Sequence, residues 1–242
     1  MALVSDTALV SDIALVSHPE CLRHNLGPEH PEQSGRIHAI ENALAQSSLW
    51  PDLVHVQPEA ASRTALERVH PKNYLDSLID ATPRSGLNWL DADTGLCLVS
   101  WNAALYAAGA GICAVDDILA GKYQRAFCNV RPPGHHAESA QAMGFCLINN
   151  VAVAAAHALT QPGIGKVAIV DFDVHHGNGT EQIFNGDERV LLISSFQHPL
   201  YPHTGTESHS GYVALPLPTH TAGAGFRNAW QQHGLPALEH PQ

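Results

Sequence analysis

The second half of the chain alternates between short apolar runs and segments with helical spacing. Residues 166–172 (KVAIVDF) and 189–196 (RVLLISSF) are apolar and rich in β-branched side chains, which is typical of strands that are buried on both faces. Residues 126–130 predict a further strand, and residues 148–159 and 180–184 predict helices between the strands. Strands that alternate with helices indicate a parallel sheet covered by helices, so the expected fold class is α/β.

The first half carries two longer helical patterns and a loop-like region. Apolar positions three or four residues apart predict a helix over 36–47. Residues 100–121 predict a second helix, with Ser100 as its N-cap and Gly121 as its stop. Alanine and glycine in the middle of this helix would permit close packing on a sheet. Prolines and glycines indicate a loop over 19–35.

A short repeat occupies the N-terminus. The sequence ALVS occurs three times with a period of six residues, beginning at Ala2, Ala8 and Ala14. This period is too short for a solenoid unit, so we interpret the repeat as a duplicated strand segment whose third copy enters the fold. We therefore expect an extension over 1–13 and a single domain over 14–242.

Composition excludes several classes of function. The chain has 242 residues and a net charge of −11, whereas a nucleic-acid-binding surface needs clustered positive charge. Its 17 histidines suit an enzyme with metal or proton chemistry. Five cysteines without a CxxC pair argue against a disulfide framework or a thiolate zinc site. No apolar run reaches the roughly 20 residues of a membrane span, and the first residues lack a signal peptide's positive charge, so we expect a cytoplasmic protein without a membrane partner.

The run DFDVHHGNG, residues 171–179, follows directly on one of the buried apolar runs. Alternation along a strand would place Asp171, Asp173 and His175 on one side, at the carboxyl end where ligands bind in α/β sheets. Two carboxylates and an imidazole are ligands that a catalytic Zn²⁺ accepts. The alternative interpretation is that these carboxylates only cap neighbouring helices.

A second run, RPPGHHAE, residues 131–138, also follows a predicted strand. The adjacent imidazoles of His135 and His136 suit general acid/base catalysis near neutral pH. Each imidazole needs an acceptor on its far nitrogen to fix its tautomer, and Asp171 and Asn178 are the candidates. Without the first run, an HH pair is more often a surface feature that has no function.

Several runs in this chain resemble the zinc-dependent histone deacetylase and acetylpolyamine amidohydrolase family, nearest its class II-like and bacterial members. They include RPPGHHA, GFCLINNVAVAA, VAIVDFDVHHGNGTEQIF, LDADTG and HPLYPHTGT, and the similarity covers about residues 14–238. The resemblance implies an arginase/deacetylase-like α/β fold with a mostly parallel central sheet, and it makes 14–242 a deacetylase domain. The implied activity is zinc-dependent removal of acetyl groups from acetyl-lysine peptides or acetylpolyamines, which yields acetate and an amine.

The resemblance also implies roles for individual residues. The catalytic roles fall to a tandem imidazole pair and its hydrogen-bonding partners, namely His135, His136 (the general base), Asp171 and Asn178. The implied zinc ligands are Asp173 and His175, and a structural K⁺ would take Asp171, Asp173, His175 and Ser194. The implied substrate-binding residues are the rim residue Asp91 and the acyl-lysine tunnel residues Gly144, Phe145 and Tyr201. From spacing alone, ordinary loop packing explains these loop aromatics equally well.

Two residues of the family pattern have no counterpart in this chain. The family places a third zinc ligand, an Asp, and a transition-state Tyr after the segment that corresponds to Leu235–Leu238. We therefore expect that this chain, taken alone, is a truncated deacetylase that binds zinc weakly and has little or no activity. The resemblance also implies that the absent strands lie within the sheet, so that strand edges would be left unpaired.

Two other functions stay open. One is a non-catalytic module that binds acyl-lysine or a polyamine in the tunnel without hydrolysing it. The other is a binuclear manganese ureohydrolase of the same broad fold. That family has a D-A-H-x-D ligand run, and this chain has Gly177 at the place of the last carboxylate.

Overall fold

The computed structural model describes residues 12–239 of the chain. The first copy of the N-terminal repeat and most of the second copy lie outside these residues. The third copy forms strand β1 (Ile13–Val16). The division into an extension over 1–13 and a domain over 14–242 stays a prediction, with Ile13 already part of a strand.

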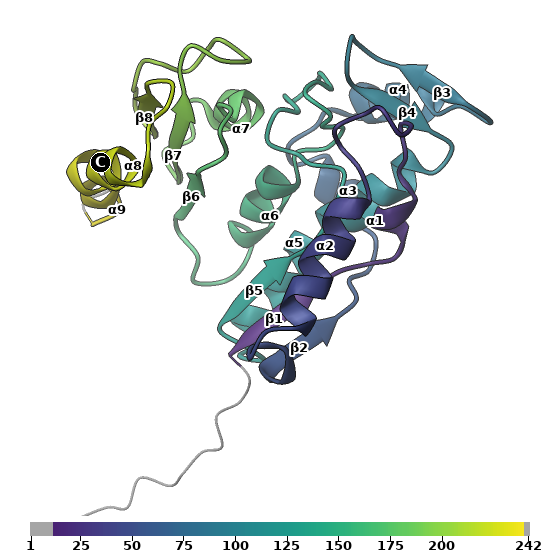
Figure 1. Ribbon diagram of the computed structural model, residues 1–242, viewed down its shortest axis with the longest axis horizontal. Coiled ribbons are helices and arrows are strands. Elements are labelled where there is room, and N and C mark those ends of the chain that lie inside the picture. The colour runs from purple at the N-terminus through teal and green to yellow at the C-terminus, as the bar shows by residue number, and fades with distance from the viewer. Residues whose placement is uncertain (1–11, 240–242) are drawn as a thin grey trace, which may run out of the picture.

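Two three-stranded parallel sheets and a small antiparallel hairpin form the β structure of the described residues (Figure 1). The first sheet has the order β2-β1-β5, with β2 at Leu53–Val56 and β5 at Arg125–Cys128. The second has the order β6-β7-β8. Its strands are β6 (Val167–Asp171), β7 (Val190–Gln197) and β8 (Tyr212–Leu217). The hairpin pairs β3 (Leu87–Trp89) with β4 (Gly95–Cys97).

Helices cover both sheets. The long helix α5 (Ser100–Leu119) packs on α6 (Asn150–Ala158), and α6 lies between the two sheets in Figure 1. The remaining helical segments are α1 (Glu20–Arg23), α2 (Gly35–Ala45), the 3₁₀ turn η1 (Trp50–Asp52), α3 (Arg63–Leu66), α4 (Lys72–Ala81), α7 (Asn178–Phe184), α8 (Gly223–Ala229), the π-helical turn η2 (Trp230–Gly234) and α9 (Leu235–Glu239).

Small residues in α5 allow it to approach two neighbours. Ala110 packs in one cluster with Ala14 and Val16 of β1, which is the close contact with a sheet that the sequence predicts. A Cβ on Gly111 would lie only 2.8 Å from the Cβ of Ala154 in α6. The same stretch of α5 therefore also permits close packing against a helix.

The predicted α/β class is correct, and parallel strands flanked by helices form the architecture. Within residues 12–239 the sheet is in two parts, because β5 pairs only with β1 and β6 pairs only with β7. Apolar side chains accompany the unpaired edge of β6: Val170 is 40% exposed and Phe172 is 72% exposed. Among the helices of this described part of the chain, none is long and apolar enough to cross a bilayer.

Candidate active site

The predicted ligand run leaves the sheet earlier than the sequence indicates. Strand β6 ends at Asp171, so strand alternation does not bring Asp173 and His175 together. Successive carboxylates hold the loop instead: Asp173 N–H donates to Asp171 Oδ1 at 3.1 Å, and His175 N–H donates to Asp173 Oδ1 at 2.7 Å. As a result, Nδ1 of His175 lies 3.2 Å from Oδ1 of Asp173. The two predicted zinc ligands are therefore neighbours.

His135 and His136 lie on the loop between β5 and α6, with ring centroids 4.0 Å apart. Each Nδ1 faces one of the two acceptors named from the sequence. His135 Nδ1 is 2.8 Å from Asp171 Oδ2, and His136 Nδ1 is 2.8 Å from Asn178 Oδ1. His135 Nε2 is 4.0 Å from Asp173 Oδ1, so the imidazole pair and the predicted ligands share one site at the carboxyl end of β6.

Glu138 is a positioning residue that the sequence reasoning missed. Its Oε1 accepts a hydrogen bond from Asn178 Nδ2 at 3.0 Å. A carboxylate only accepts, so the Asn178 amide must turn its nitrogen to Glu138 and its oxygen to His136. His136 Nδ1 then donates, which leaves its Nε2 as a hydrogen-bond acceptor. The only sequence signal was the position of Glu138 within the RPPGHHAE run.

The two imidazoles differ in basicity. Burial and the neighbouring His135 lower the pKa of His136 to about 4, so this ring is neutral at pH 7. Burial also acts to lower the pKa of His135, but the hydrogen bond and negative charge of Asp171 outweigh it and raise the pKa. In return, His135 lowers the pKa of Asp171 against the effect of burial. Paired groups with diverging pKa values are typical of acid and base roles.

Two of the three predicted tunnel residues, Gly144 and Tyr201, lie beside the His136 ring. Gly144 has φ +55°, and a Cβ there would lie 2.5 Å from His136 Cδ2, so only glycine lets the loop pass this close to the ring. Phe145 follows with φ +69°, a strained conformation for an aromatic residue. The ring of Tyr201 meets His136 edge-on at 5.1 Å and His175 at 6.0 Å. Burial and the nearby acidic side chains raise the pKa of Tyr201 to about 12, so its hydroxyl stays protonated.

The predicted rim residue Asp91 lies on the exposed loop between β3 and β4. Its Oδ1 accepts hydrogen bonds from the backbone N–H groups of Asp93, at 2.9 Å, and Thr94. Thr94 Oγ1 in turn accepts the N–H of Phe145 at 3.1 Å. One Asp91 oxygen thus stabilises its own turn, and the turn is attached to the loop that carries Phe145.

Ser194 lies directly beside Asp171 in the neighbouring strand β7 and is fully buried. Its Oγ has no hydrogen-bond partner among the residues that the structure describes. A buried hydroxyl without a partner costs free energy, and an oxygen-binding cation beside Asp171 would satisfy it. The predicted K⁺ ligands therefore include a side chain that fits a cation.

The donor set fits a zinc site only in part. Asp173 and His175 supply an oxygen and a nitrogen side by side, and both are ligands that zinc accepts. Among residues 12–239, no group of three or more His, Cys, Asp or Glu side chains is arranged to hold a metal. His176 does not help, because it turns away and its Nδ1 lies 3.1 Å from Thr204 Oγ1. Catalytic zinc sites usually have three protein ligands, so these residues supply one ligand too few.

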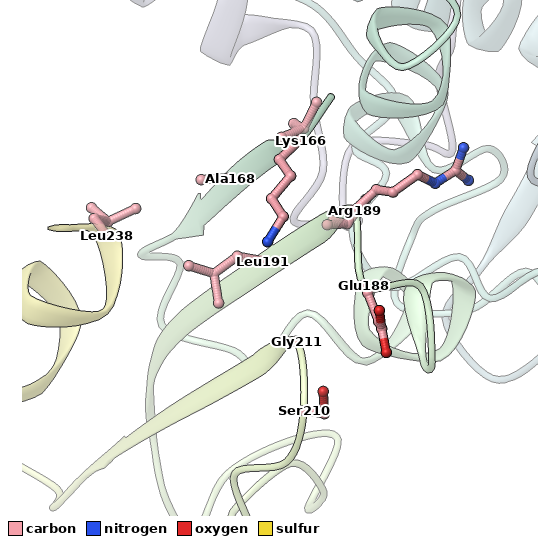
Figure 2. A pocket seen from close by; sticks show the side chains of 10 residues that line it. Lys166, Ala168, Glu188, Arg189, Leu191, Ser210, Gly211 and Leu238 are labelled. Atoms are coloured by element: carbon pink, nitrogen blue, oxygen red, sulfur yellow. The ribbon is translucent and has the colours of Figure 1, made fainter. Parts of the chain in front are cut away.

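Two of the cavities that adjoin the second sheet lie at opposite ends of its strands. One, of about 660 Å³, opens beside His135, Asp171 and Asp173 and continues along the free edge of β6. The other, of about 190 Å³, lies at the amino ends of β6 and β7 between Lys166, Arg189 and Leu238 (Figure 2). None of the predicted site residues lines this second cavity, so the candidate active site belongs to the carboxyl end.

Comparisons of this chain with known proteins identify its family. The model of the histone deacetylase domain matches residues 30–242, so the chain belongs to the histone deacetylase family. It is 37% identical to a probable deacetylase of Archaeoglobus fulgidus, over 86% of this chain and 60% of the relative. It is 35% identical to histone deacetylase 14, chloroplastic, of Arabidopsis thaliana, over 90% of this chain and 57% of the relative.

A solved structure is also similar. The crystal structure of the HDA15 HD domain superposes with a TM-score of 0.84 at 34% identity and covers 93% of this chain and 68% of that one. An uncharacterized protein of Synechocystis is 39% identical over 90% of this chain and 74% of its own length. The chain thus spans between 57% and 74% of the length of these three curated relatives.

Proposed function

We propose that the site at the carboxyl end of β6 belongs to a zinc-dependent amidohydrolase that removes acetyl groups from acetyl-lysine peptides or acetylpolyamines. One observation carries the proposal: two adjacent imidazoles, each with its own fixed Nδ1 partner, face a neighbouring carboxylate and imidazole pair. Membership of the histone deacetylase family supports this reaction class. The cytoplasmic location stays a prediction.

In the proposed reaction His136 is the base. Its Nδ1–H is committed to Asn178, so Nε2 is free to take a proton from the attacking water. His135, which retains its proton more strongly because of Asp171, donates a proton to the leaving amine. Zinc held by Asp173 and His175 would polarise the amide carbonyl and make the water more acidic. The products are acetate and the free amine.

The substrate would enter between loop residues. Gly144 and Tyr201 adjoin His136, and Phe145 extends from the same loop; we propose that these three line the acyl-lysine tunnel. Asp91, on the loop that is hydrogen-bonded to Phe145 through Thr94, would hold the substrate at the rim. We assign the structural cation to Ser194, Asp171, Asp173 and His175, because Ser194 Oγ otherwise lacks a partner within residues 12–239.

A second candidate is a non-catalytic module that binds acyl-lysine or a polyamine. The observation that favours it is the donor set: Asp173 and His175 lie together, and among the residues that the structure describes no group of three or more His, Cys, Asp or Glu is arranged to hold a metal. We propose that the chain taken alone binds zinc weakly and has little or no deacetylase activity. A binuclear manganese ureohydrolase is disfavoured further, since it would need more carboxylate ligands than this loop offers.

Zinc titration by calorimetry and acetate release test these proposals together. The purified chain should bind zinc with low affinity, and Asp173→Asn should weaken binding further, whereas Asp187→Asn, in a turn away from the site, should not. Acetyl-lysine peptide and N-acetylputrescine should give at most slow acetate release that His136→Gln abolishes. Tight stoichiometric zinc binding with rapid turnover would overturn the weak-binding proposal. Zinc binding that ignores Asp173→Asn would overturn the ligand assignment.

A further inference from the structure

Strand β1 (Ile13–Val16) is the central strand of the first sheet, and its sequence occurs a second time directly upstream. Residues 12–17 read DIALVS and residues 6–11 read DTALVS, so the two segments differ only where Thr7 corresponds to Ile13. Ile13 is the least buried residue of β1. The chain therefore contains two nearly identical candidates for one strand position.

The β1 position accepts only a particular set of apolar side chains. Ala14, Leu15 and Val16 are each at most 2% exposed. Ala14 and Val16 belong to one buried cluster with Ala110 and Tyr123. Residues 6–11 contain the same alanine, leucine and valine in the same order. The upstream segment thus satisfies every buried position of the strand.

The backbone contacts at both ends of β1 also suit either segment. The carbonyl oxygen of Asp12 accepts the N–H groups of Gln124 and Arg125, at 3.1 and 3.0 Å. At the other end the carbonyl oxygen of Val16 accepts the N–H of Asn129 at 2.9 Å. The upstream segment has an aspartate and a valine at the corresponding places. These hydrogen bonds would therefore form again if the strand shifted by six residues.

A shift of six residues preserves the face to which each side chain points. Side chains alternate along a strand with a period of two, so an even shift returns alanine and valine to the same neighbours. Residues 12–17 would then form an insertion between the strand and His18. His18 is held independently of them, because its ring stacks on Tyr106 at 3.6 Å and its Nδ1 accepts the N–H of Glu20. The start of helix α1 can therefore stay in place.

We propose that β1 has two registers, in which either residues 12–17 or residues 6–11 fill the centre of the first sheet. The observed register is favoured in the intact chain, because the shift moves the apolar side chains of Ile13–Val16 out of the core. Damage to residues 12–17 reverses the preference: the closure entropy of a loop grows only slowly with its length, whereas a buried unpaired charge is very costly. The second register keeps β5 paired, and β5 leads into the loop that carries His135 and His136.

The same substitution in the two segments gives a matched pair of variants. Val16→Asp places an unpaired carboxylate at a fully buried position. The full chain should nevertheless stay soluble and keep a cooperative urea transition at a lower midpoint, because Val10 then takes the buried position. Val10→Asp alone should leave the midpoint unchanged, and the double variant should lose the cooperative transition. Loss of the transition in Val16→Asp, or its survival in the double variant, would overturn the proposal.

Thiol protection shows directly which segment is in the sheet. Iodoacetamide should modify the introduced thiol of Val10→Cys at least about tenfold more slowly once Val16→Asp is added, because a core position reacts only when the chain opens. Fully buried Cys146 is the reference for folding in the same digest. Val16→Ser, which buries only a neutral hydroxyl, is the milder version for a chain that must stay folded, and it should slow the introduced thiol several-fold. An unchanged rate while Cys146 stays protected would show that β1 has one register.

Discussion

Glu138 accepts a hydrogen bond from the side-chain amide of Asn178, and this contact determines which nitrogen of His136 is free to accept a proton. The Glu138 carboxylate accepts a hydrogen bond from the amide nitrogen of Asn178 at 3.0 Å. The amide oxygen therefore faces His136 Nδ1, at 2.8 Å. Within the described part of the chain, the Glu138 side chain makes no hydrogen bond to the predicted metal ligands or to the His136 imidazole. It nevertheless fixes the tautomer of the proposed base through one intervening side chain.

Replacing Asn178 by a carboxylate should make His136 more basic. In Asn178→Asp a negative charge would lie beside Nδ1 and favour the imidazolium, so the pKa of His136 should rise from about 4 by about 1 to 3 pH units. NMR titration of the His136 ring measures this directly and does not depend on metal. Glu138→Gln is the control: its amide oxygen still accepts from Asn178, so the pKa should stay near 4. An unchanged titration in Asn178→Asp would refute the hydrogen-bond assignment.

Stability should decrease in mild acid because of His136. Its folded-state pKa of about 4 lies below the ordinary value of 6.5, so between these values the unfolded chain binds more protons and stability falls as pH falls. Between pH 7 and pH 5, protonation linked to His136 should lower the free energy of unfolding by about 2 kcal/mol. Urea unfolding of wild type and His136→Gln at both pH values isolates the effect. His135 behaves oppositely: its pKa is raised, so its contribution is present below pH 6.5 and is lost as pH rises further.

An equal pH dependence in wild type and His136→Gln would show that His136 is not buried in its neutral form. The comparison cancels His135 and the carboxylates, because both proteins contain them. A flatter slope in the variant is the expected result.

Gly144 should not tolerate a side chain. Gly144→Ala combines a left-handed backbone, φ +55°, with a Cβ placed 2.5 Å from the His136 ring. Gly163→Ala is the matched control, since φ there is +85° and no atom lies within 4 Å of the added Cβ. The free energy of unfolding of the control should fall by about 1–2 kcal/mol because of the backbone conformation alone. In Gly144→Ala it should fall further, and the NMR signals of His136 should shift. If the two variants lose the same unfolding free energy in urea, the loop with Gly144 moves away from His136 without a free-energy cost.

The motifs predicted much of the site from the sequence, but the stated geometry was wrong for Asp173 and His175. The strand was expected to continue through them, and β6 ends at Asp171. Local hydrogen bonds from backbone N–H groups to carboxylates override the strand and form a turn. The two predicted ligands are adjacent for that reason, and apolar periodicity contains no information about such a turn.

Strand β8 and the role of Glu138 were not predicted from the sequence, for different physical reasons. Strand β8 contains Pro216, and proline within a strand pattern argues against a strand unless it is at an edge. Among residues 12–239 β8 is an edge strand that pairs only with β7, so Pro216 is tolerated. Glu138 was missed because its partner Asn178 is 40 residues away in sequence, and local spacing cannot identify long-range polar pairs.

The buried ion pair of Arg131 and Glu32 should be essential for stability. Arg131 is fully buried at the start of the loop that carries His135 and His136, and it donates from Nε to Glu32 Oε1 at 2.8 Å and from Nη1 to the carbonyl oxygen of Cys21 at 2.9 Å. Arg131→Met leaves the Glu32 carboxylate buried without its partner, so unfolding free energy in urea should fall by about 3–5 kcal/mol. Adding Glu32→Met should restore part of the lost unfolding free energy, because the uncompensated Glu32 carboxylate is then removed. Arg63→Met, which breaks an exposed pair with Asp76, is the control and should have a much smaller effect. If the double variant were less stable than Arg131→Met, the penalty would arise from lost packing and hydrogen bonds to carbonyls and not from an uncompensated carboxylate.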